Sequence, residues 1–233
     1  MADIFGTEGP DSLVGTSEVD SLFGLDGSDT LEGSREGGDT LIGGLGSDSL
    51  FSFGNNNWLF AGKGDDILRG AAGGSGGTDT MFGDIGNDVL RGGDGNDLMF
   101  GNNNQDQLLG ESGNDTIFGG QGNDSIDASA GNDLIFGDLG NDTYQGGVGN
   151  DQFVIGPGFG TDVIVDYGRE TDSLVLIGEV TEADLDFVEG NVVGGGRDDV
   201  SIILRSTGET IAILQDTSLA EFNSVKIIEP LII

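Results

Sequence analysis

Aspartate recurs in this chain at a nearly constant spacing, and carboxylates placed in this way could bind metal cations. Between Asp79 and Asp151 one aspartate falls every nine residues without a slip. The same position can be traced back to Asp11, with Asn57 in place of aspartate at one step, which gives sixteen repeats. The carboxylates that we predict to bind metal are those of Asp29, Asp39, Asp48, Asp66, Asp79, Asp88, Asp97, Asp106, Asp115, Asp124, Asp133, Asp142 and Asp151.

Glycines accompany the aspartates at two main positions, two and five residues before them. Turns this tight need positive φ angles, which glycine adopts without steric cost, and they leave carbonyl oxygens directed into the turn. Carbonyls and carboxylates suit calcium, whereas the imidazole and thiolate ligands that transition metals prefer are absent from this chain. The glycines that we predict to shape the sites are Gly83, Gly86, Gly92, Gly95, Gly110, Gly113, Gly119, Gly122, Gly137, Gly140, Gly146 and Gly149.

An apolar side chain stands two residues after every aspartate position, from Leu13 to Phe153. A short strand with its middle side chain inward, followed by a glycine turn, cannot bury that side chain alone, but stacked copies can. The pattern therefore predicts an all-β solenoid built from three-residue strands around a narrow apolar interior. The largest departure from the spacing carries an insertion from Ala71 to Gly77, which we expect to bulge from a turn.

This combination of glycine, aspartate and apolar positions resembles the hemolysin-type, or RTX, calcium-binding repeat, over about residues 6 to 155. The resemblance implies a right-handed parallel β-roll in which two nonapeptides form one coil of about 18 residues. It also implies that each calcium ion lies between two turns stacked one coil apart, so that aspartates such as Asp88 and Asp106 share an ion. Such a roll would bind roughly 10 to 14 calcium ions.

We divide the chain into the β-roll at residues 1–155 and a β-rich C-terminal cap at residues 156–233, where ordinary strand patterns replace the repeats. The runs 151–155 and 162–167 resemble the C-terminal part of RTX proteins that leave the cell by type I secretion, a route with an uncleaved C-terminal signal. The final residues, 229–233, are only loosely similar to such signals. The resemblance therefore implies a location outside the cell or at its surface. The route fits the sequence, in which neither an N-terminal signal peptide nor a membrane span is predicted.

The charge of the chain favours cations as ligands. Forty-two acidic residues stand against eight basic ones, a formal charge of −34, which argues against nucleic acid or an anionic membrane as a partner. With 46 glycines and so much like charge, the repeats are expected to be largely disordered without metal and to fold on binding calcium outside the cell. The alternative is that glycine and aspartate only mark the turns of a solenoid that needs no metal.

The residue after each inward side chain forms a second regular series along the repeats. It is apolar in every second repeat and mostly polar in the repeats between. One sheet of the roll should therefore carry an aromatic ribbon outside, and the other should be mostly polar. Two interpretations remain open. In the first, the cap or the N-terminal residues cover this ribbon, or its rings merely brace the strands. In the second, the ribbon packs against another copy of the chain or a surface partner. The candidate interface residues are Trp58, Phe60, Phe82, Phe100, Phe118 and Phe136.

No constellation of catalytic residues stands out. The segment 73–77 formally fits a nucleophile elbow, but the chain has no histidine to activate its serine, and carboxylate pairs are expected by chance in so acidic a sequence. We therefore expect a non-enzymatic structural or adhesive protein, of a surface layer, sheath or matrix filament. The alternative is a stand-alone secretion and folding module of a larger exported system. Ice binding is disfavoured because the middle turn positions show no threonine ladder.

Overall fold

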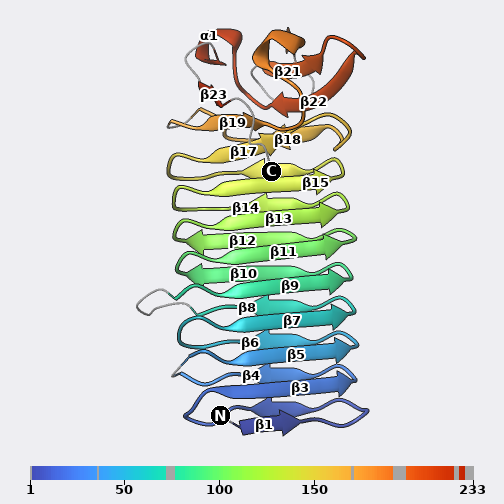
Figure 1. The fold of residues 1–233 in the computed structure, drawn as a ribbon, viewed down its shortest axis with the longest axis vertical. Helices are drawn as coiled ribbons and strands as arrows, with labels where there is room; N and C mark the ends of the chain where they lie inside the picture. Colours follow the sequence, from blue (N-terminus) through green and yellow to red (C-terminus); the bar gives the residue numbers. More distant parts are fainter. Residues whose placement is uncertain are drawn as a thin grey trace.

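A computed structural model describes residues 2–35, 37–71, 77–168, 171–190, 198–222 and 226–228. Most of the predicted insertion and the final residues 229–233 lie outside the described residues. Within these ranges the fold is an all-β solenoid, in which the chain coils between two sheets whose strands are parallel throughout the repeats (Figure 1). No helix in the same ranges is long and apolar enough to cross a membrane.

The two sheets contain 11 and 12 strands of the described chain. The first sheet consists of β1 (Ala2–Phe5), β3 (Asp20–Asp26), β5 (Thr40–Leu45), β7 (Trp58–Lys63), β9 (Thr80–Ile85), β11 (Leu98–Asn103), β13 (Thr116–Gln121), β15 (Leu134–Leu139), β17 (Gln152–Ile155), β19 (Ser173–Leu176) and β23 (Lys226–Ile228). The second consists of β2 (Ser12–Val14), β4 (Thr30–Glu32), β6 (Ser49–Phe51), β8 (Ile67–Arg69), β10 (Val89–Asp94), β12 (Gln107–Ser112), β14 (Ser125–Asp127), β16 (Thr143–Gln145), β18 (Asp162–Ile164), β22 (Glu209–Leu214), β21 (Asp199–Leu204) and β20 (Leu185–Gly190).

Neighbouring strands in the repeats are one coil apart in the sequence. Between β11 and β13, Leu98 pairs with Thr116 and Phe100 with Phe118, a step of 18 residues. The predicted coil of two nonapeptides is thereby confirmed. Because every second repeat lies in the same sheet, any property that alternates between repeats is sorted onto one sheet or the other.

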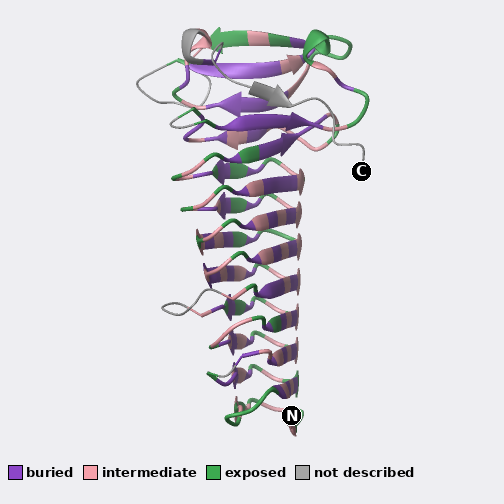
Figure 2. Cartoon of the chain, turned by 60° about the vertical axis from the view of Figure 1, so that its left-hand side comes forward, coloured by how far each residue is buried: buried purple, intermediate pink, exposed green. Residues whose placement is uncertain are grey.

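The inward side chains form one continuous core between the sheets. From Leu22 to Phe153, the side chain two residues after each aspartate position is at most 2% exposed. Leu13, in an end coil, is only partly buried. The strands accordingly show alternating buried and more accessible bands along the roll (Figure 2).

Most strands of the first sheet, and β10 and β12 of the second, are longer than the three residues predicted. β9 and β11 each have six residues, because the strand continues through the first part of the glycine turn. Asp84 and Asn102, which follow the turn glycine, have φ angles of 69° and 78°, and their backbones still pair with each other. The prediction of three residues is right for β8 and β14 in the second sheet.

Both sheets continue past Ile155 into the C-terminal region (Figure 1). β18 and β19 pair in parallel with β16 and β17, and β22 pairs in parallel with β18. β21 and β20 then extend the second sheet in antiparallel order, beside the short helices η1 (Glu182–Asp184) and α1 (Leu219–Phe222). Ile155 thus ends the regular repeats, but neither the sheets nor the core, which extends to Phe222.

Candidate calcium-binding turns

Each turn brings one aspartate to the start of the next strand, where its side chain is buried. The repeat aspartates from Asp20 to Asp151 are at most 3% exposed. The backbone N–H of Asp88 donates to Oδ1 of Asp106, one coil further on, at 2.8 Å. Asn57 keeps this role with its amide oxygen, which accepts a backbone N–H at 3.0 Å. Such bonds link coil to coil along both edges of the roll.

The second carboxylate oxygen of most of these aspartates is buried without a hydrogen-bond partner in the described part of the chain. A Cβ placed on Gly101 would lie 2.5 Å from Oδ2 of Asp106 and 2.5 Å from the carbonyl oxygen of Gly119. Two acceptors that face one space repel each other unless a cation or a proton lies between them. The aspartates with such an Oδ2 are Asp29, Asp48, Asp66, Asp88, Asp97, Asp106, Asp115, Asp124, Asp133, Asp142 and Asp162.

Three of the thirteen predicted ligands are not in this set. Oδ2 of Asp39 accepts the N–H of Ser34 at 2.5 Å, and Oδ2 of Asp79 accepts the hydroxyl of Ser52 at 3.4 Å. Oδ2 of Asp151 is also not among the unpartnered atoms. Ten of the predicted carboxylates therefore have a buried Oδ2 without a hydrogen-bond partner among the described residues, and these three do not.

The predicted glycines occupy the two kinds of position expected of them. Those two residues before an aspartate have positive φ, 131° to 159°, and a Cβ there would collide with a carbonyl of the previous coil; they are Gly86, Gly95, Gly113, Gly122, Gly140 and Gly149. Those five residues before lie against the aspartate Oδ2; they are Gly83, Gly92, Gly110, Gly119, Gly137 and Gly146. The second position is less strict, since alanine occupies it at Ala61 and Ala128.

Burial raises the pKa of the turn carboxyls, because the charged form loses its water. The pKa of Asp97 and Asp115 rises to about 7 and that of Asp88 to about 8, from burial first. The N–H bond to Oδ1 offsets part of each rise, and carboxylates one coil away add to it by repulsion. Without a cation, these carboxyls would bind protons near neutral pH.

The donor set fits a hard cation held partly by the backbone. No group of three or more His, Cys, Asp or Glu side chains in the described ranges is placed to hold a metal. Such groups do not form there because each coil adds only one repeat aspartate to each edge of the roll. Carbonyl oxygens such as that of Gly119 lie close to the carboxylates, and a mixed set of carboxylate and carbonyl oxygens is the kind that calcium accepts.

A family model matches the same turns by sequence. The model of the RTX calcium-binding nonapeptide repeat matches overlapping segments at residues 5–36, 34–68, 51–73, 73–108, 100–135, 109–144 and 118–153. The chain belongs to the RTX repeat family. Its turns bind calcium, as the repeats of this family do. A comparison with curated proteins finds no match.

The RTX ladder continues to two aspartates that the sequence analysis did not assign. The N–H groups of Asp142 and Asp151 donate to Oδ1 of Asp162 and of Asp172, each at 3.1 Å. These steps are 20 and 21 residues long, so a search for multiples of nine passes over them. The available signal was Gly160, which stands two residues before Asp162 as the turn glycines do.

The aromatic ribbon lies on the outer face of the first RTX sheet, as predicted. The rings of Phe60, Phe82, Phe100 and Phe118 stack one above the next with centroids 4.9 to 5.0 Å apart. They are half-buried, and Trp58 beside them is 48% exposed. The middle of the ribbon is therefore accessible to a partner.

Phe136 departs from this expectation of an accessible ribbon. Its ring continues the stack, 4.5 Å from that of Phe118, but the residue is only 7% exposed. It packs with Val154 and Val175 in a small cluster separate from the core of the roll. The C-terminal end of the ribbon is thus already covered, and Phe136 is not a surface residue.

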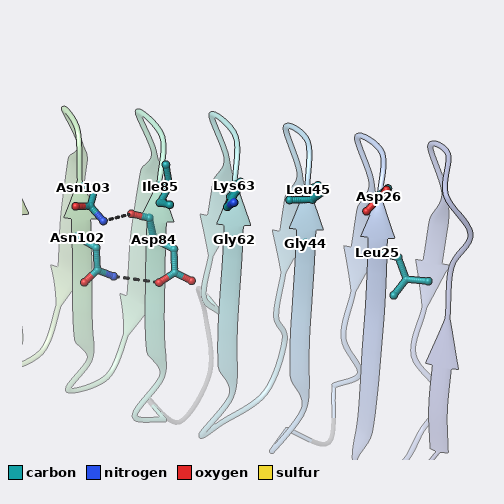
Figure 3. Close-up of a pocket in the computed structure, with 10 residues that line it drawn as sticks. All are labelled: Leu25, Asp26, Gly44, Leu45, Gly62, Lys63, Asp84, Ile85, Asn102 and Asn103. Atoms are coloured by element: carbon teal, nitrogen blue, oxygen red, sulfur yellow. Dashed lines mark hydrogen bonds between the residues drawn. The ribbon is translucent and has the colours of Figure 1, made fainter.

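A shallow groove of about 670 Å³ runs along the turn edge of the first sheet. Gly44 and Gly62, which lack side chains, lie between the larger residues Leu25 and Asp84 (Figure 3). At one end, Nδ2 of Asn103 donates to the backbone oxygen of Asp84 at 3.3 Å. The lining changes from coil to coil, so the groove presents no repeated side chain.

Proposed function

We propose that this protein is a secreted, non-enzymatic calcium-binding β-roll that folds when it meets calcium outside the cell and has a structural or adhesive role. The observation that carries the folding step is the series of buried, unpartnered Oδ2 atoms in the described turns. A buried carboxylate without a compensating charge is strongly destabilising. Each turn with such an ionised carboxylate therefore opposes folding until a cation binds.

The magnitude is large enough for calcium to control folding. At a calcium concentration about three times the site dissociation constant, each site adds about 0.8 kcal/mol, and ten sites add about 8 kcal/mol. That is comparable to the whole stability of an ordinary domain, about 5 to 15 kcal/mol. Ten divalent ions would also reduce the formal charge of −34 to about −14.

The folding step is tested by far-UV circular dichroism of the chain with chelator and then with millimolar calcium. We expect a change from a disordered to a β-sheet spectrum. Magnesium at the same concentration is the matched control, and it should be much less effective because it demands a stricter octahedral geometry. A β-sheet spectrum of equal intensity in chelator would show instead that glycine and aspartate only mark turns of a metal-independent solenoid.

The structural or adhesive role rests on the ribbon. Four half-buried phenylalanines stacked along one face form a contiguous apolar surface, which usually marks an interface in a soluble protein. We infer that the first sheet packs against another copy or a surface partner, as in a layer, sheath or filament. The groove of mixed side chains offers no comparable regular surface, and its lining gives no support to ice binding.

Assembly is tested with Phe100→Arg combined with Phe118→Arg, followed by sedimentation velocity and electron microscopy in calcium. We expect the wild type to assemble and the variant to remain monomeric with its calcium-induced spectrum intact. Leu109→Arg, which places the same charge on the outer face of the second sheet, is the matched control and should still assemble. A wild type that sediments as a monomer at all protein concentrations in calcium would refute self-assembly.

A stand-alone secretion and folding module is the second candidate. It is favoured by the resemblance of residues 151–155 and 162–167 to the C-terminal part of type I secreted proteins. In that case the chain would promote export of a fused passenger through a type I system but would neither assemble nor adhere. Comparing export of a passenger with and without residues 156–233 separates this candidate from the first.

A further inference from the structure

The turn that follows β15 differs from the regular turns in which oxygen faces the aspartate. A Cβ built on Gly119 would lie 2.6 Å from Oδ2 of Asp124 and 2.9 Å from the carbonyl oxygen of Gly137 in the next coil. At Gly137 itself, the two nearest atoms are the hydroxyl oxygen of Tyr144 and Oδ2 of Asp142. A phenol oxygen therefore lies beside the aspartate Oδ2 at this turn, where the regular turns have a backbone carbonyl among the nearest atoms.

Asp162 supplies a second carboxylate from the next coil. It begins β18, which pairs with β16, and its Oδ1 accepts the N–H of Asp142 at 3.1 Å. The turn before it copies the repeat, since Gly160 has φ of 133° and the N–H of Thr161 donates to Oδ1 of Asn141 at 2.8 Å. Asp162 nevertheless lies beyond residue 153, where the match to the repeat family ends.

The side chain of Asp162 interacts with those of Tyr144 and Asp142, which brings three buried oxygens together: Oδ2 of Asp142, Oδ2 of Asp162 and the hydroxyl of Tyr144. None of the three has a hydrogen bond of good geometry within the described chain. Each of these residues is at most 1% exposed. We propose that they form a further divalent-cation site, of the calcium class, with the Tyr144 hydroxyl in place of the carbonyl ligand. The ion would join the last matched repeats to β18, the first strand beyond them.

The chemistry of the three groups is consistent with this site. Two carboxylates supply the charge that a divalent ion needs, as one carboxylate from each of two coils does in the regular turns. A phenol hydroxyl is neutral at physiological pH, because the ordinary pKa of tyrosine is about 10, and it therefore resembles a carbonyl oxygen in charge.

The opposite edge of the roll provides an internal contrast. At Gly146 the atoms nearest to a built Cβ belong to Asp151 and, at 2.9 Å, to the ring of Phe153, which has no oxygen to offer. Oδ2 of Asp172 accepts the N–H of Gly168 at 2.9 Å. The proposed site therefore extends the series of cation sites on one edge only, although the hydrogen bonds to Oδ1 continue on both.

The site is tested in the full chain by counting bound calcium with equilibrium dialysis. Asp162→Asn and Tyr144→Phe should each bind one ion fewer than the wild type, while the spectrum in saturating calcium shows that both still fold. The matched controls, Asp172→Asn and Tyr167→Phe, should bind as many ions as the wild type. Unchanged ion counts in both Asp162→Asn and Tyr144→Phe would overturn the site.

Terbium luminescence gives an independent readout, because a bound terbium ion emits when a neighbouring tyrosine is excited. In a Trp58→Phe background the chain contains only two sensitising residues, Tyr144 and Tyr167. Asp162→Asn, which retains both tyrosines, should lose most of this emission, and Asp172→Asn should retain it. If Tyr144→Phe lowers stability but leaves the ion count unchanged, the hydroxyl only donates a hydrogen bond to a carboxylate, and its role as a ligand is refuted.

Discussion

Asp106→Asn should destabilise the calcium-loaded roll and stabilise the metal-free one. Oδ1 of Asp106 accepts the N–H of Asp88 at 2.8 Å, and Oδ2 faces the carbonyl oxygen of Gly119. Asparagine retains Oδ1 and replaces Oδ2 with an amide group, which can donate to that carbonyl. Asn57 shows that an amide oxygen preserves the bond between coils. The substitution thus removes an ion ligand but satisfies the turn without an ion.

The two effects have different sizes as well as opposite signs. In calcium the variant loses up to one site's contribution, about 0.8 kcal/mol at threefold excess over the dissociation constant and about 2.7 kcal/mol at hundredfold excess. Without calcium it gains a hydrogen bond worth about 0.5 to 1.5 kcal/mol and also loses an uncompensated buried charge. The difference between the two conditions should therefore exceed about 1 kcal/mol.

The assay is urea denaturation followed by far-UV circular dichroism, once in saturating calcium and once in chelator with an osmolyte that favours compact states. The matched control is Asp26→Asn, which makes the same chemical change at an exposed position and should shift neither midpoint appreciably. If Asp106→Asn lowers stability by the same amount in both conditions, Oδ2 is not an ion ligand. The carboxylate would then act only as an acceptor in the ladder.

Three further predictions concern protons, turns and the core. Because burial raises the carboxyl pKa values, to about 6 for Asp48 and about 8 for Asp88, stability of the metal-free roll is present below about pH 4 and lost as pH rises through about 6 to 8. Chelated protein should therefore show more β-structure by circular dichroism at about pH 5 than at about pH 8.5, and equal disorder at both would contradict this. Gly122→Ala, at φ of 153° and against a carbonyl, should cost more than about 1 kcal/mol in calcium. Gly9→Ala, where a Cβ would meet no atom within 4 Å, is the control and should cost less. Similar urea midpoints would contradict the argument. Leu108→Ala, at a fully buried position, should lower the free energy of unfolding by about 2 to 5 kcal/mol. Leu109→Ala, at an outward-facing position, is the control. Equal losses in the two variants would show that burial of Leu108 does not stabilise the core.

The repeats allowed most of the roll to be predicted because a solenoid is nearly one-dimensional. Each coil contacts mainly its neighbours, so the coil length of 18 residues and the inward position of residues such as Leu108 follow from local pattern alone. The sorting of Phe82 and Phe100 onto one sheet followed in the same way. The six-residue strands of the first sheet could not be predicted in this way. Asp84 and Asn102 adopt a left-handed conformation, which the repeat pattern does not reveal in residues other than glycine.

Which turns hold an unpartnered carboxylate was decided by the tertiary structure. The sequence alone placed aspartate, glycine and an apolar residue at fixed intervals, and this was enough to specify a calcium-binding all-β solenoid. It could not distinguish Asp39, whose Oδ2 is satisfied by Ser34, from Asp106, whose Oδ2 is not. Nor could it bring Asp162 beside Asp142 across an irregular step of 20 residues. The physical reason is that a hydrogen bond depends on which atoms of neighbouring coils come into contact. Spacing along the chain predicts these contacts only where the repeat length stays constant.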